Sequence, residues 1–315
     1  MRILITGGAG CLGSNLIEHW VPNGHEILVI DNFATGKHEV VPDVPGLTIR
    51  EGTIADGALV NQCFADFKPD VVVHSAASYK DPDDWGEDAR TNVLGSIHVA
   101  KAANANGVGR LVNFQTALCY GRPQQLPIPA THPTAPFTSY GITKTAGEQF
   151  MLLSGVPTLT LRIANVTGPR LAIGPIPTFY KRLKAGQSCF CSDTSRDFLD
   201  MSDFLAFMDM AIKIDAPTGT FNISSGEAHS IKEIFDLVTD YLGLDRIDVP
   251  VVPPAADDVP VVSLDAQETK NTFGWTPKVH FAETIRRQLQ WYDQHGISDV
   301  FSHLKPPAQE TKGSP

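Results

Sequence analysis

Tyr140 and Lys144 stand four residues apart, just after a Pro-rich loop and at the start of a stretch with helical character. Positions i and i+4 of a helix share one face, so a phenol and an ammonium group would point into the same space. The cation stabilises a phenolate and lowers the pKa of the phenol. Such a pair can take a proton from a substrate hydroxyl near neutral pH. A surface tyrosine and a solvated lysine would give the same pattern. Other parts of the sequence are therefore needed to show whether the pair is catalytic.

A glycine-rich segment near the N-terminus supplies a partner for this chemistry. An apolar run at 2–6 leads into Gly7-Gly8-Ala9-Gly10-Cys11-Leu12-Gly13, then a helical stretch at 14–20 and a second apolar run at 26–30 that ends in Asp31. Strand, glycine loop, helix, strand and acid form the dinucleotide-binding fingerprint, in which the helix N-terminus binds the pyrophosphate. Asp31 lies close to the roughly 20-residue spacing of the carboxylate that binds the adenosine ribose. A carboxylate there favours NAD because it repels a 2′-phosphate, while Lys37 nearby keeps NADP open.

The glycines fit two registers. Gly8-x-Gly10-x-x-Gly13 is the general dinucleotide form, and Gly7-x-x-Gly10-x-x-Gly13 after Thr6 is typical of short-chain dehydrogenases and reductases. Spacing alone does not choose between them. The Tyr140–Lys144 pair favours the second register.

The elements that must position these residues alternate along the chain. Strands are predicted at 47–50, 70–74, 110–114 and 158–163, and helices at 58–67 and 85–105. This rhythm predicts an α/β fold with a Rossmann-like, doubly wound parallel sheet, whose ligands bind at the carboxyl ends of the strands.

The pattern changes after about residue 165, where glycine and proline interrupt the chain repeatedly. Helices are predicted at 178–185, 203–214, 231–242 and 281–292, and a strand at 219–224 that returns to the main sheet. We therefore expect an NAD-binding domain over 1–165, with return crossings near 200–224. A smaller C-terminal α/β substrate lobe over 166–304 and a flexible tail over 305–315 would follow.

Composition narrows the class of protein. The 315 residues are 42% hydrophobic, and the formal net charge of −10 argues against binding nucleic acid or an acidic membrane surface. No apolar run approaches the roughly 20 residues of a membrane span, and residues 1–6 predict a buried strand, not a secretion signal. The five cysteines form no C-x-x-C pair. They predict reduced thiols, a cytoplasmic protein and no metal site.

With these residues in place, the chain resembles the extended short-chain dehydrogenases/reductases of the nucleotide-sugar epimerase and dehydratase family. The matching segments are 6–13, 31–37, 74–77, 92–95, 120–121, 140–144, 162–168, 196–198 and 273–277. Segments 168–191 and 301–304 are most similar to NAD-dependent sugar epimerase homologues from bacterial O-antigen clusters. The resemblance therefore implies lipopolysaccharide or glycoconjugate precursor synthesis. It also implies a homodimer through the helices near 92–105 and 140–153.

The resemblance implies a set of NAD contacts. Those for the pyrophosphate are Gly7, Gly10, Cys11, Leu12 and Gly13, and those for the adenosine ribose are Asp31, Asn32, Thr35 and Gly36. Thr53 and Ile54 stand where the family has an Asp-Ile pair facing the adenine, so that carboxylate contact is lost. Ala76 and Ala77 would pass under the cofactor. Lys80 would reach a ribose or phosphate, with a solvated loop lysine as the alternative, and His74 is expected to be a packed residue and not a catalyst.

The catalytic expectations centre on the end of the strand at 110–114. Aligned by Tyr120-Gly121, Thr116 falls where the family has the serine or threonine that hydrogen-bonds the substrate oxygen beside Tyr140. Lys144 would bind the nicotinamide ribose and lower the phenol pKa. Dehydratases carry an Asp-Glu pair directly after this threonine, whereas this chain has Ala117 and Leu118. The missing acid and base argue against dehydration.

For the substrate, the resemblance implies that Asn165 contacts a phosphate or ribose and that Arg196 binds a diphosphate. An ion pair of Arg196 with Asp193 or Asp197 is the alternative. Thr178 and Asp258 are further expected contacts. Ala255 replaces a second arginine of the family, so the diphosphate clamp is thinner, or Lys181 or Arg182 completes it.

These expectations favour an NAD-dependent nucleotide-sugar 4-epimerase, with a UDP-sugar as the favoured substrate. Tyr140 would remove the 4-hydroxyl proton during transient oxidation at C4. The 4-keto sugar would turn, and reduction on the other face would complete the reaction. The alternatives are a reductase, dehydrogenase or dehydratase of the same family and, from another class, a non-catalytic NAD-binding regulator.

Overall fold

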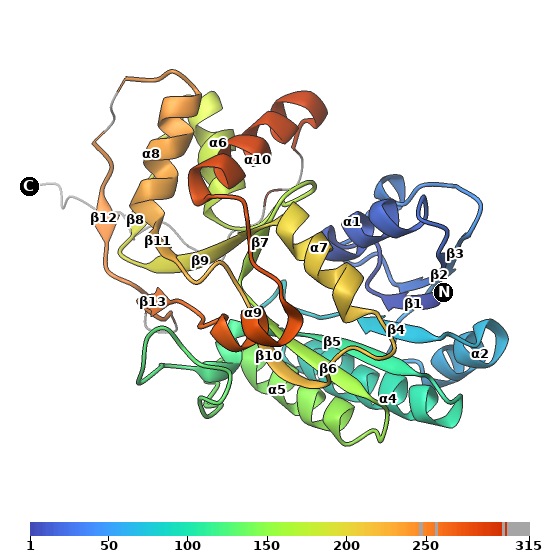
Figure 1. Ribbon diagram of the computed structural model, residues 1–315. Helices are drawn as coiled ribbons and strands as arrows, with labels where there is room; N and C mark the ends of the chain where they lie inside the picture. Colours follow the sequence, from blue (N-terminus) through green and yellow to red (C-terminus); the bar gives the residue numbers. More distant parts are fainter. Residues whose placement is uncertain (246–247, 256–257, 298–299, 301–315) are drawn as a thin grey trace, which may run out of the picture.

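A seven-stranded sheet forms the centre of the protein in the computed structural model, which describes residues 1–245, 248–255, 258–297 and 300 (Figure 1). Its order is β10-β6-β5-β4-β1-β2-β3, and every neighbouring pair is parallel. The strands are β1 (Arg2–Thr6), β2 (Glu26–Asp31), β3 (Leu47–Glu51), β4 (Val71–His74), β5 (Arg110–Thr116), β6 (Thr158–Ile163) and β10 (Gly219–Ile223). The predicted doubly wound sheet is confirmed, including the return of the chain at 219–223.

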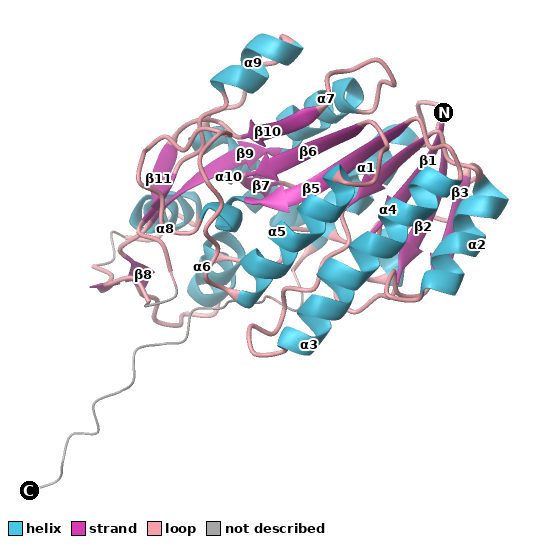
Figure 2. Cartoon of the chain, turned by 90° about the horizontal axis from the view of Figure 1, so that it is seen from below, coloured by secondary structure: helices cyan, strands magenta, loops and turns pink. Residues whose placement is uncertain are grey.

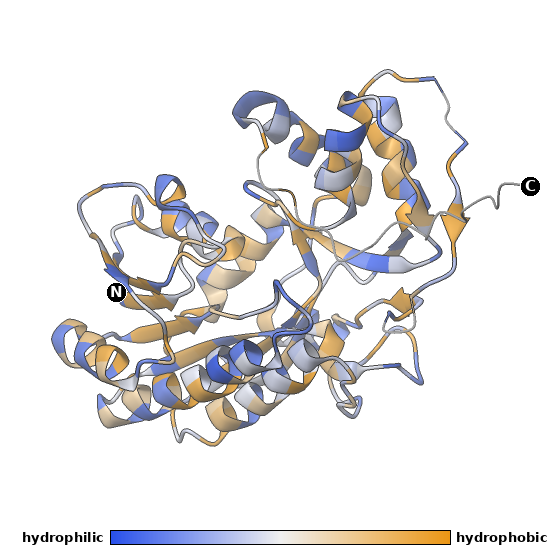
Figure 3. Cartoon of the chain, turned by 180° about the vertical axis from the view of Figure 1, so that it is seen from behind, coloured by the Kyte–Doolittle hydropathy of each residue, from blue (hydrophilic) through white to orange (hydrophobic). Residues whose placement is uncertain are grey.

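Helices cover both faces of this sheet. Figure 2 shows α2 (Gly57–Phe67), α4 (Ser96–Ala105) and α5 (Ser139–Leu152) on one face, while α1 (Cys11–Trp20) and α7 (Met201–Ala211) cover the other. Side chains of a strand alternate between faces. Accordingly, Leu4 packs into the hydrophobic cluster of α2 and α4, and Ile3 and Ile5 pack into the opposite cluster. Apolar residues therefore fill the strands, as Figure 3 shows, because both faces are buried.

The predicted helix at 85–105 is interrupted by a π turn. It comprises α3 (Trp85–Asp88), a π-helical turn at Ala89–Gly95, and α4. A Cβ on Gly95 would lie 2.5 Å from Cγ1 of Ile54, so glycine permits this close approach to the segment after β3. Such turns insert one residue into a helix and redirect neighbouring side chains.

A second layer of elements forms beside the sheet from later parts of the chain. Its helices are α6 (Pro175–Lys184), α8 (Ile231–Tyr241) and α10 (Phe281–His295), which share a hydrophobic cluster of their own. Its strands are β7 (Asn165–Thr167), β9 (Ser195–Asp200), β11 (Ala228–Ser230) and β13 (Val261–Val262), with β8 (Cys191–Ser192) paired to β12 (Val251–Val252). A last helix, α9 (Gln267–Phe273), packs on β10.

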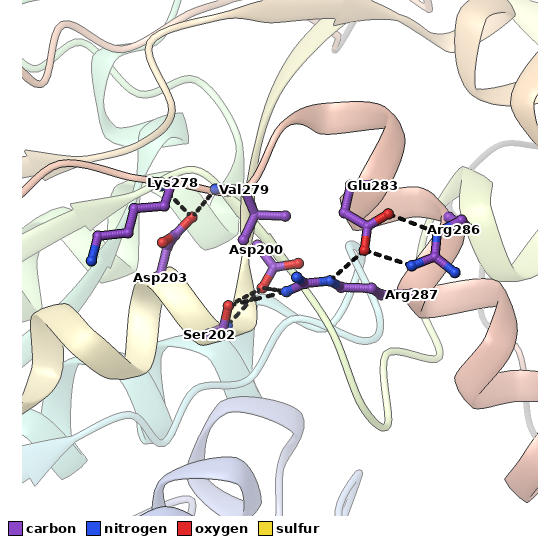
Figure 4. A network of polar contacts seen from close by, with 8 residues as sticks. All are labelled: Asp200, Ser202, Asp203, Lys278, Val279, Glu283, Arg286 and Arg287. Atoms are coloured by element: carbon purple, nitrogen blue, oxygen red, sulfur yellow. Dashed lines mark hydrogen bonds and ion pairs between the residues drawn. The ribbon is translucent and has the colours of Figure 1, made fainter.

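Polar contacts tie α10 to the start of α7 (Figure 4). Asp200 caps α7 by accepting the Ser202 N–H at 2.8 Å, and the Arg287 guanidinium of α10 lies 3.6 Å from the same carboxylate. Asp203 accepts the backbone N–H groups of residues 278 and 279, each at 2.9 Å. The end of β9, α7 and the segment before α10 are thereby held together.

No helix in the described part of the chain is long and apolar enough to cross a membrane. The predicted tail at 305–315 and the segment 301–304 lie outside the described residues.

Candidate cofactor and catalytic site

The glycine loop lies between β1 and α1 and is built for close backbone packing. Gly7 has a φ of +72°, and a Cβ there would lie 2.7 Å from the Cα of Ala76. A Cβ on Gly13 would lie 2.6 Å from the Gly7 carbonyl oxygen. The loop also starts α1 without a capping side chain, since Gly10 is the N-cap and the first turn carries no acid. The first N–H groups of α1, which begins at Cys11, therefore remain available for an anion.

Asp31 fixes the loop that follows β2. Its Oδ2 accepts the Ala9 N–H and its Oδ1 accepts the Phe33 N–H, both at 2.8 Å. A Cβ on Gly36 would lie 2.6 Å from the Ala9 Cβ, so the 32–36 segment lies against the glycine loop. The structure thus brings the residues predicted for pyrophosphate and adenosine ribose together, and this cradle fits a dinucleotide.

The other predicted cofactor residues border the same region. Thr53 follows β3 and accepts the Ala55 N–H at 3.1 Å, while Ile54 is buried. The Ala76 N–H donates to Oγ1 of Thr6 at 3.3 Å, which holds the segment of Ala76 and Ala77 against the end of β1. Lys80 is exposed on the loop beyond it.

Thr116 ends β5, and Tyr140 and Lys144 lie one turn apart in the first half of α5, as predicted. The Thr116 hydroxyl oxygen accepts the Leu118 N–H at 3.1 Å. Its own proton therefore remains available to donate to another oxygen. Ala117 and Leu118 follow, so no acid or base stands directly after Thr116.

Burial dominates the electrostatics of the catalytic pair. It lowers the pKa of Lys144 to about 8, against the opposing effect of Glu148. Burial also raises the pKa of Tyr140, with further contributions from Tyr79 and Asp88. The phenol pKa of the protein alone therefore lies above its ordinary value, not below it as expected, because desolvation and the neighbouring Tyr79 and Asp88 all raise it.

His74 is a packed residue, as expected. The Ser96 hydroxyl donates to the Asn92 carbonyl at 2.6 Å, so its oxygen must accept from Nε2 of His74 at 3.0 Å. Nδ1 is then the acceptor for the Thr6 hydroxyl at 2.8 Å. Burial lowers the pKa of His74 to about 3, so the ring stays neutral and joins the ends of β1 and β4 to the π turn.

Three residues near the catalytic pair were not singled out by the sequence. Tyr79 hydrogen-bonds Thr35 and packs edge-on against Tyr140, with ring centroids 6.2 Å apart. Asn92, in the π turn, accepts the Ser78 N–H at 2.8 Å and donates to Oγ1 of Thr143 at 3.1 Å. Gln115 lies in β5, and its side chain hydrogen-bonds Lys144 and Glu148 of α5. The sequence signals available were Asn92, in the family-matching segment 92–95, and a tyrosine in the loop after β4.

Cys11 has no catalytic signature. Its thiol donates to the Pro169 carbonyl at 3.4 Å, and burial raises its pKa to about 12. It is a neutral thiol at the start of α1. No group of three or more His, Cys, Asp or Glu side chains within the described ranges is arranged to hold a metal ion.

The structure places Arg196 in an ion pair, but its partner is Asp258, so the predicted alternatives Asp193 and Asp197 are wrong. Asp197 instead binds Ser225, Gly226 and Leu264. Strand β13 pairs with β9, with Val262 opposite Arg196, and Asp258 lies just before this strand.

The remaining predicted substrate residues lie on β7 and α6. Asn165 begins β7 and donates to the Asp197 carbonyl at 3.0 Å, and Thr178 donates to the Gly174 carbonyl at 2.7 Å inside α6. Arg182 donates to the Ser188 carbonyl at 2.8 and 2.6 Å, so it is already used in closing the end of α6. Lys181 is exposed.

Known proteins match this chain over nearly its whole length. A family model described as the NAD dependent epimerase/dehydratase family matches residues 3–224. The Bordetella bronchiseptica enzyme WbmG, solved in complex with NAD, is 68% identical, with a TM-score of 0.92 over 97% of this chain and 98% of that chain. WbmG is also solved with NAD and UDP.

More distant relatives carry activity names. The UDP-glucose 4-epimerase of Thermotoga maritima, solved with UDP-glucose, is 27% identical with a TM-score of 0.86 over 93% of this chain and 99% of that chain. A UDP-glucose 4-epimerase of Mycolicibacterium smegmatis is 29% identical over 93% of this chain and 98% of its own length.

Proposed function

This chain belongs to the NAD-dependent epimerase/dehydratase family, and we propose that it is an NAD-dependent nucleotide-sugar 4-epimerase that acts on a UDP-sugar. One observation carries the choice of reaction: Thr116 ends β5, Tyr140 and Lys144 lie on α5, which packs against β5, and Ala117 and Leu118 supply no second acid or base. Relatives named UDP-glucose 4-epimerase, and the WbmG complex with NAD and UDP, support the substrate class.

The residues that would hold NAD come from the loops after β1, β2, β3 and β4 and from helix α5. The glycine loop and the N-terminus of α1 would bind the pyrophosphate, Asp31 and the 32–36 segment the adenosine ribose, and Lys144 the nicotinamide ribose. The rest of the NAD site would be lined by Thr53, Ile54, Ala76, Ala77 and Lys80. NAD, when bound, supplies a reversible hydride acceptor for C4 of the sugar.

The chain's own residues handle the proton. Tyr140 takes the proton of the 4-hydroxyl, and the Thr116 hydroxyl, whose lone pair already accepts the Leu118 N–H, donates a hydrogen bond to the same oxygen. Charged Lys144 favours the phenolate form of Tyr140. The reaction is redox-neutral, so the same phenol returns the proton once the 4-keto sugar has turned, and no further acid–base group is required.

The nucleotide would be held while the sugar turns. We place the diphosphate against Arg196, with Asn165, Thr178 and Asp258 as further contacts. Arg182 is engaged with Ser188, so the clamp rests on Arg196.

A panel of UDP-, GDP-, CDP- and dTDP-sugars, followed by NMR of the C4 proton, tests the activity. Interconversion of C4 epimers without net change in NAD(H) is expected. Net NADH formation or consumption would indicate a reductase or dehydrogenase, and loss of water a dehydratase. No turnover of any sugar by the NAD-loaded protein would leave the regulator as the better reading.

We further propose two lobes, an NAD-binding domain over 1–165 with crossings near 200–224 and a substrate lobe over 166–304. The separate hydrophobic cluster of α6, α8 and α10 supports this division. A homodimer through the α4–α5 side is proposed because that side exposes large apolar residues. These are Leu94, Phe150, Leu152 and Leu153. The five free cysteines support a cytoplasmic role in glycoconjugate or lipopolysaccharide precursor synthesis.

A further inference from the structure

Gln115 contacts the backbone of two catalytic residues at once. Its Oε1 accepts the Thr116 N–H at 2.8 Å, and its Nε2 donates to the Lys144 carbonyl at 3.0 Å. The side chain is buried between the end of β5 and α5. One amide therefore sets the distance between the strand that presents Thr116 and the helix that presents Tyr140 and Lys144.

A buried ion pair fixes which way this amide points. Nε2 of Gln115 also donates to Oε2 of Glu148 at 2.7 Å, and Oε1 of Glu148 accepts from Arg162 at 2.8 Å. Flipping the amide would set Oε1 against a carboxylate and a carbonyl, and Nε2 against an N–H group. Each of these contacts would be repulsive, so only one orientation satisfies every group.

Further contacts hold Arg162 in place. It donates to the Ala130 carbonyl at 3.0 Å, and its guanidinium lies over the Tyr120 ring at 4.8 Å. Tyr120 in turn donates to Asn222 of β10 at 2.6 Å. Strands β5, β6 and β10 and helix α5 thus support one amide.

We propose that Gln115 is a positioning residue that sets Thr116 relative to the Tyr140–Lys144 pair, and that the Glu148–Arg162 pair keeps its amide in the working orientation. The tests of this proposal that measure kcat and KM rest on the proposed epimerase function. Gln115 touches neither substrate nor cofactor in this scheme.

The first test compares two buried amides on the same strand. Gln115→Met keeps the size and removes every hydrogen bond, and Asn113→Leu does the same two residues earlier, where the amide lies 3.5 Å from Thr160. Because a misplacement of about 1 Å can cost about 100-fold, we expect Gln115→Met to lower kcat by about 10- to 100-fold. The KM and the bound NAD should stay within about twofold of wild type. Asn113→Leu should leave all three unchanged. A folded Gln115→Met protein with wild-type kcat would overturn the proposal.

The second test uses pH and stays informative if the methionine variant does not fold. Gln115→Glu has the same shape but places a carboxyl against Glu148, which raises the pKa of one of the two. Once protonated, that carboxyl can donate in place of Nε2. The ratio of variant to wild-type kcat should therefore rise as pH falls from about 9 to about 6. A ratio that does not change with pH would contradict the proposal.

Other titrating groups around the position do not imitate this result. They are Lys144 and Glu148 from α5, Arg162 from β6, Tyr120 and Cys119 from the turn after β5, and His74 from β4. The pKa values of Tyr120 and Cys119 are raised to about 12 and that of His74 is lowered to about 3. Lys144 has a pKa of about 8, and a carboxylate at position 115 would raise it as Glu148 does. That change would make the ratio rise towards alkaline pH, so it cannot imitate a rise as pH falls.

A measurement that needs no turnover tests the role of Gln115 independently of the proposed epimerase function. In the NAD-loaded protein, the ultraviolet absorbance of phenolate, minus that of Tyr140→Phe, reports the ionisation of Tyr140. Gln115→Met should move its midpoint by at least about half a pH unit, while Asn113→Leu should not. If no sugar is turned over but the midpoint moves, the epimerase proposal fails and the role of Gln115 stands. An unmoved midpoint would overturn the role of Gln115.

Discussion

Arg196 and Asp258 are joined by an ion pair, although both were expected to contact the substrate. Asp258 also accepts the Val259 N–H at 2.8 Å, which fixes the carboxylate beside the guanidinium. Burial lowers the pKa of Arg196 and Asp258 opposes this. A diphosphate that binds Arg196 would therefore meet a cation that is already partly neutralised.

Removing Arg196 should weaken nucleotide binding. We expect Arg196→Ala to raise the Kd for UDP by about tenfold or more, since hydrogen bonds to charged groups contribute about 1.5–3 kcal/mol. Calorimetry of the NAD-loaded protein measures this. Arg182→Ala is the matched control, because Arg182 donates to Ser188, and it should leave the Kd unchanged. Asp258→Asn should also weaken UDP binding, because Asp258 holds the Arg196 guanidinium in place and is itself a proposed substrate contact. Tighter binding would show that Asp258 only competes for Arg196.

Tyr140→Phe should abolish turnover and spare binding. Loss of the only proposed general acid–base group should lower kcat by about 100- to 10,000-fold. NAD content and UDP affinity should be retained, because the ring still packs against Tyr79. Tyr292→Phe controls for the loss of a buried hydroxyl, since Tyr292 donates to the Leu171 carbonyl and lies outside the proposed chemistry. A Tyr140→Phe protein with full activity would end the catalytic proposal.

The pH profile should report Lys144. Its pKa is lowered to about 8, and only its charged form stabilises phenolate, so kcat should fall as pH rises through about 8. Glu148 raises this pKa, so Glu148→Gln should move the alkaline fall to lower pH. Initial rates from about pH 6 to about pH 10 would show it. His74, with a pKa of about 3, should contribute nothing, and an alkaline limb unaffected by Glu148→Gln would contradict the assignment.

The buried Glu148–Arg162 pair should matter for stability as well. Arg162→Met leaves the Glu148 carboxylate unpaired in the core, which should lower the free energy of unfolding by about 3–5 kcal/mol. Urea unfolding measures the loss. Arg286→Met breaks an exposed pair with Glu283 within α10 and should leave the free energy of unfolding nearly unchanged. The double variant Glu148→Leu, Arg162→Met should recover part of the stability, because no lone charge remains.

The proposed dimer surface can be tested by introducing a charged side chain into it. Leu153 is 79% exposed at the end of α5, and Ile214 is 50% exposed after α7. Leu153→Glu should shift the protein from dimer to monomer in light scattering, because the new carboxylate would have to be desolvated in the interface. Ile214→Glu should leave the mass unchanged. A wild-type monomer at all accessible concentrations would refute the dimer.

Patterns of residues close together in the sequence predicted the fold and the loops that would hold the cofactor. Glycine spacing, Asp31 and alternating apolar runs are local features whose consequences follow from backbone geometry. The site details that were missed depend on residues distant in sequence. Gln115 contacts Lys144 and Glu148 of α5, and Arg196 pairs with Asp258, which precedes β13. The π turn was missed because a helix with one inserted residue keeps nearly the same apolar pattern. Desolvation of Tyr140 also depends on packing that no local pattern reports.

The position of β10 has a consequence for synthesis of the chain. The seventh strand of the main sheet is residues 219–223, and it pairs with β6 only after β9 and α7 have been made. A nascent chain that ends near residue 165 therefore exposes β6 as an open edge, with Leu159 and Leu161 lacking their cover from α7. We therefore expect that the two proposed lobes do not fold one after the other, and that truncation at the proposed boundary yields an aggregating fragment, not a free NAD-binding module.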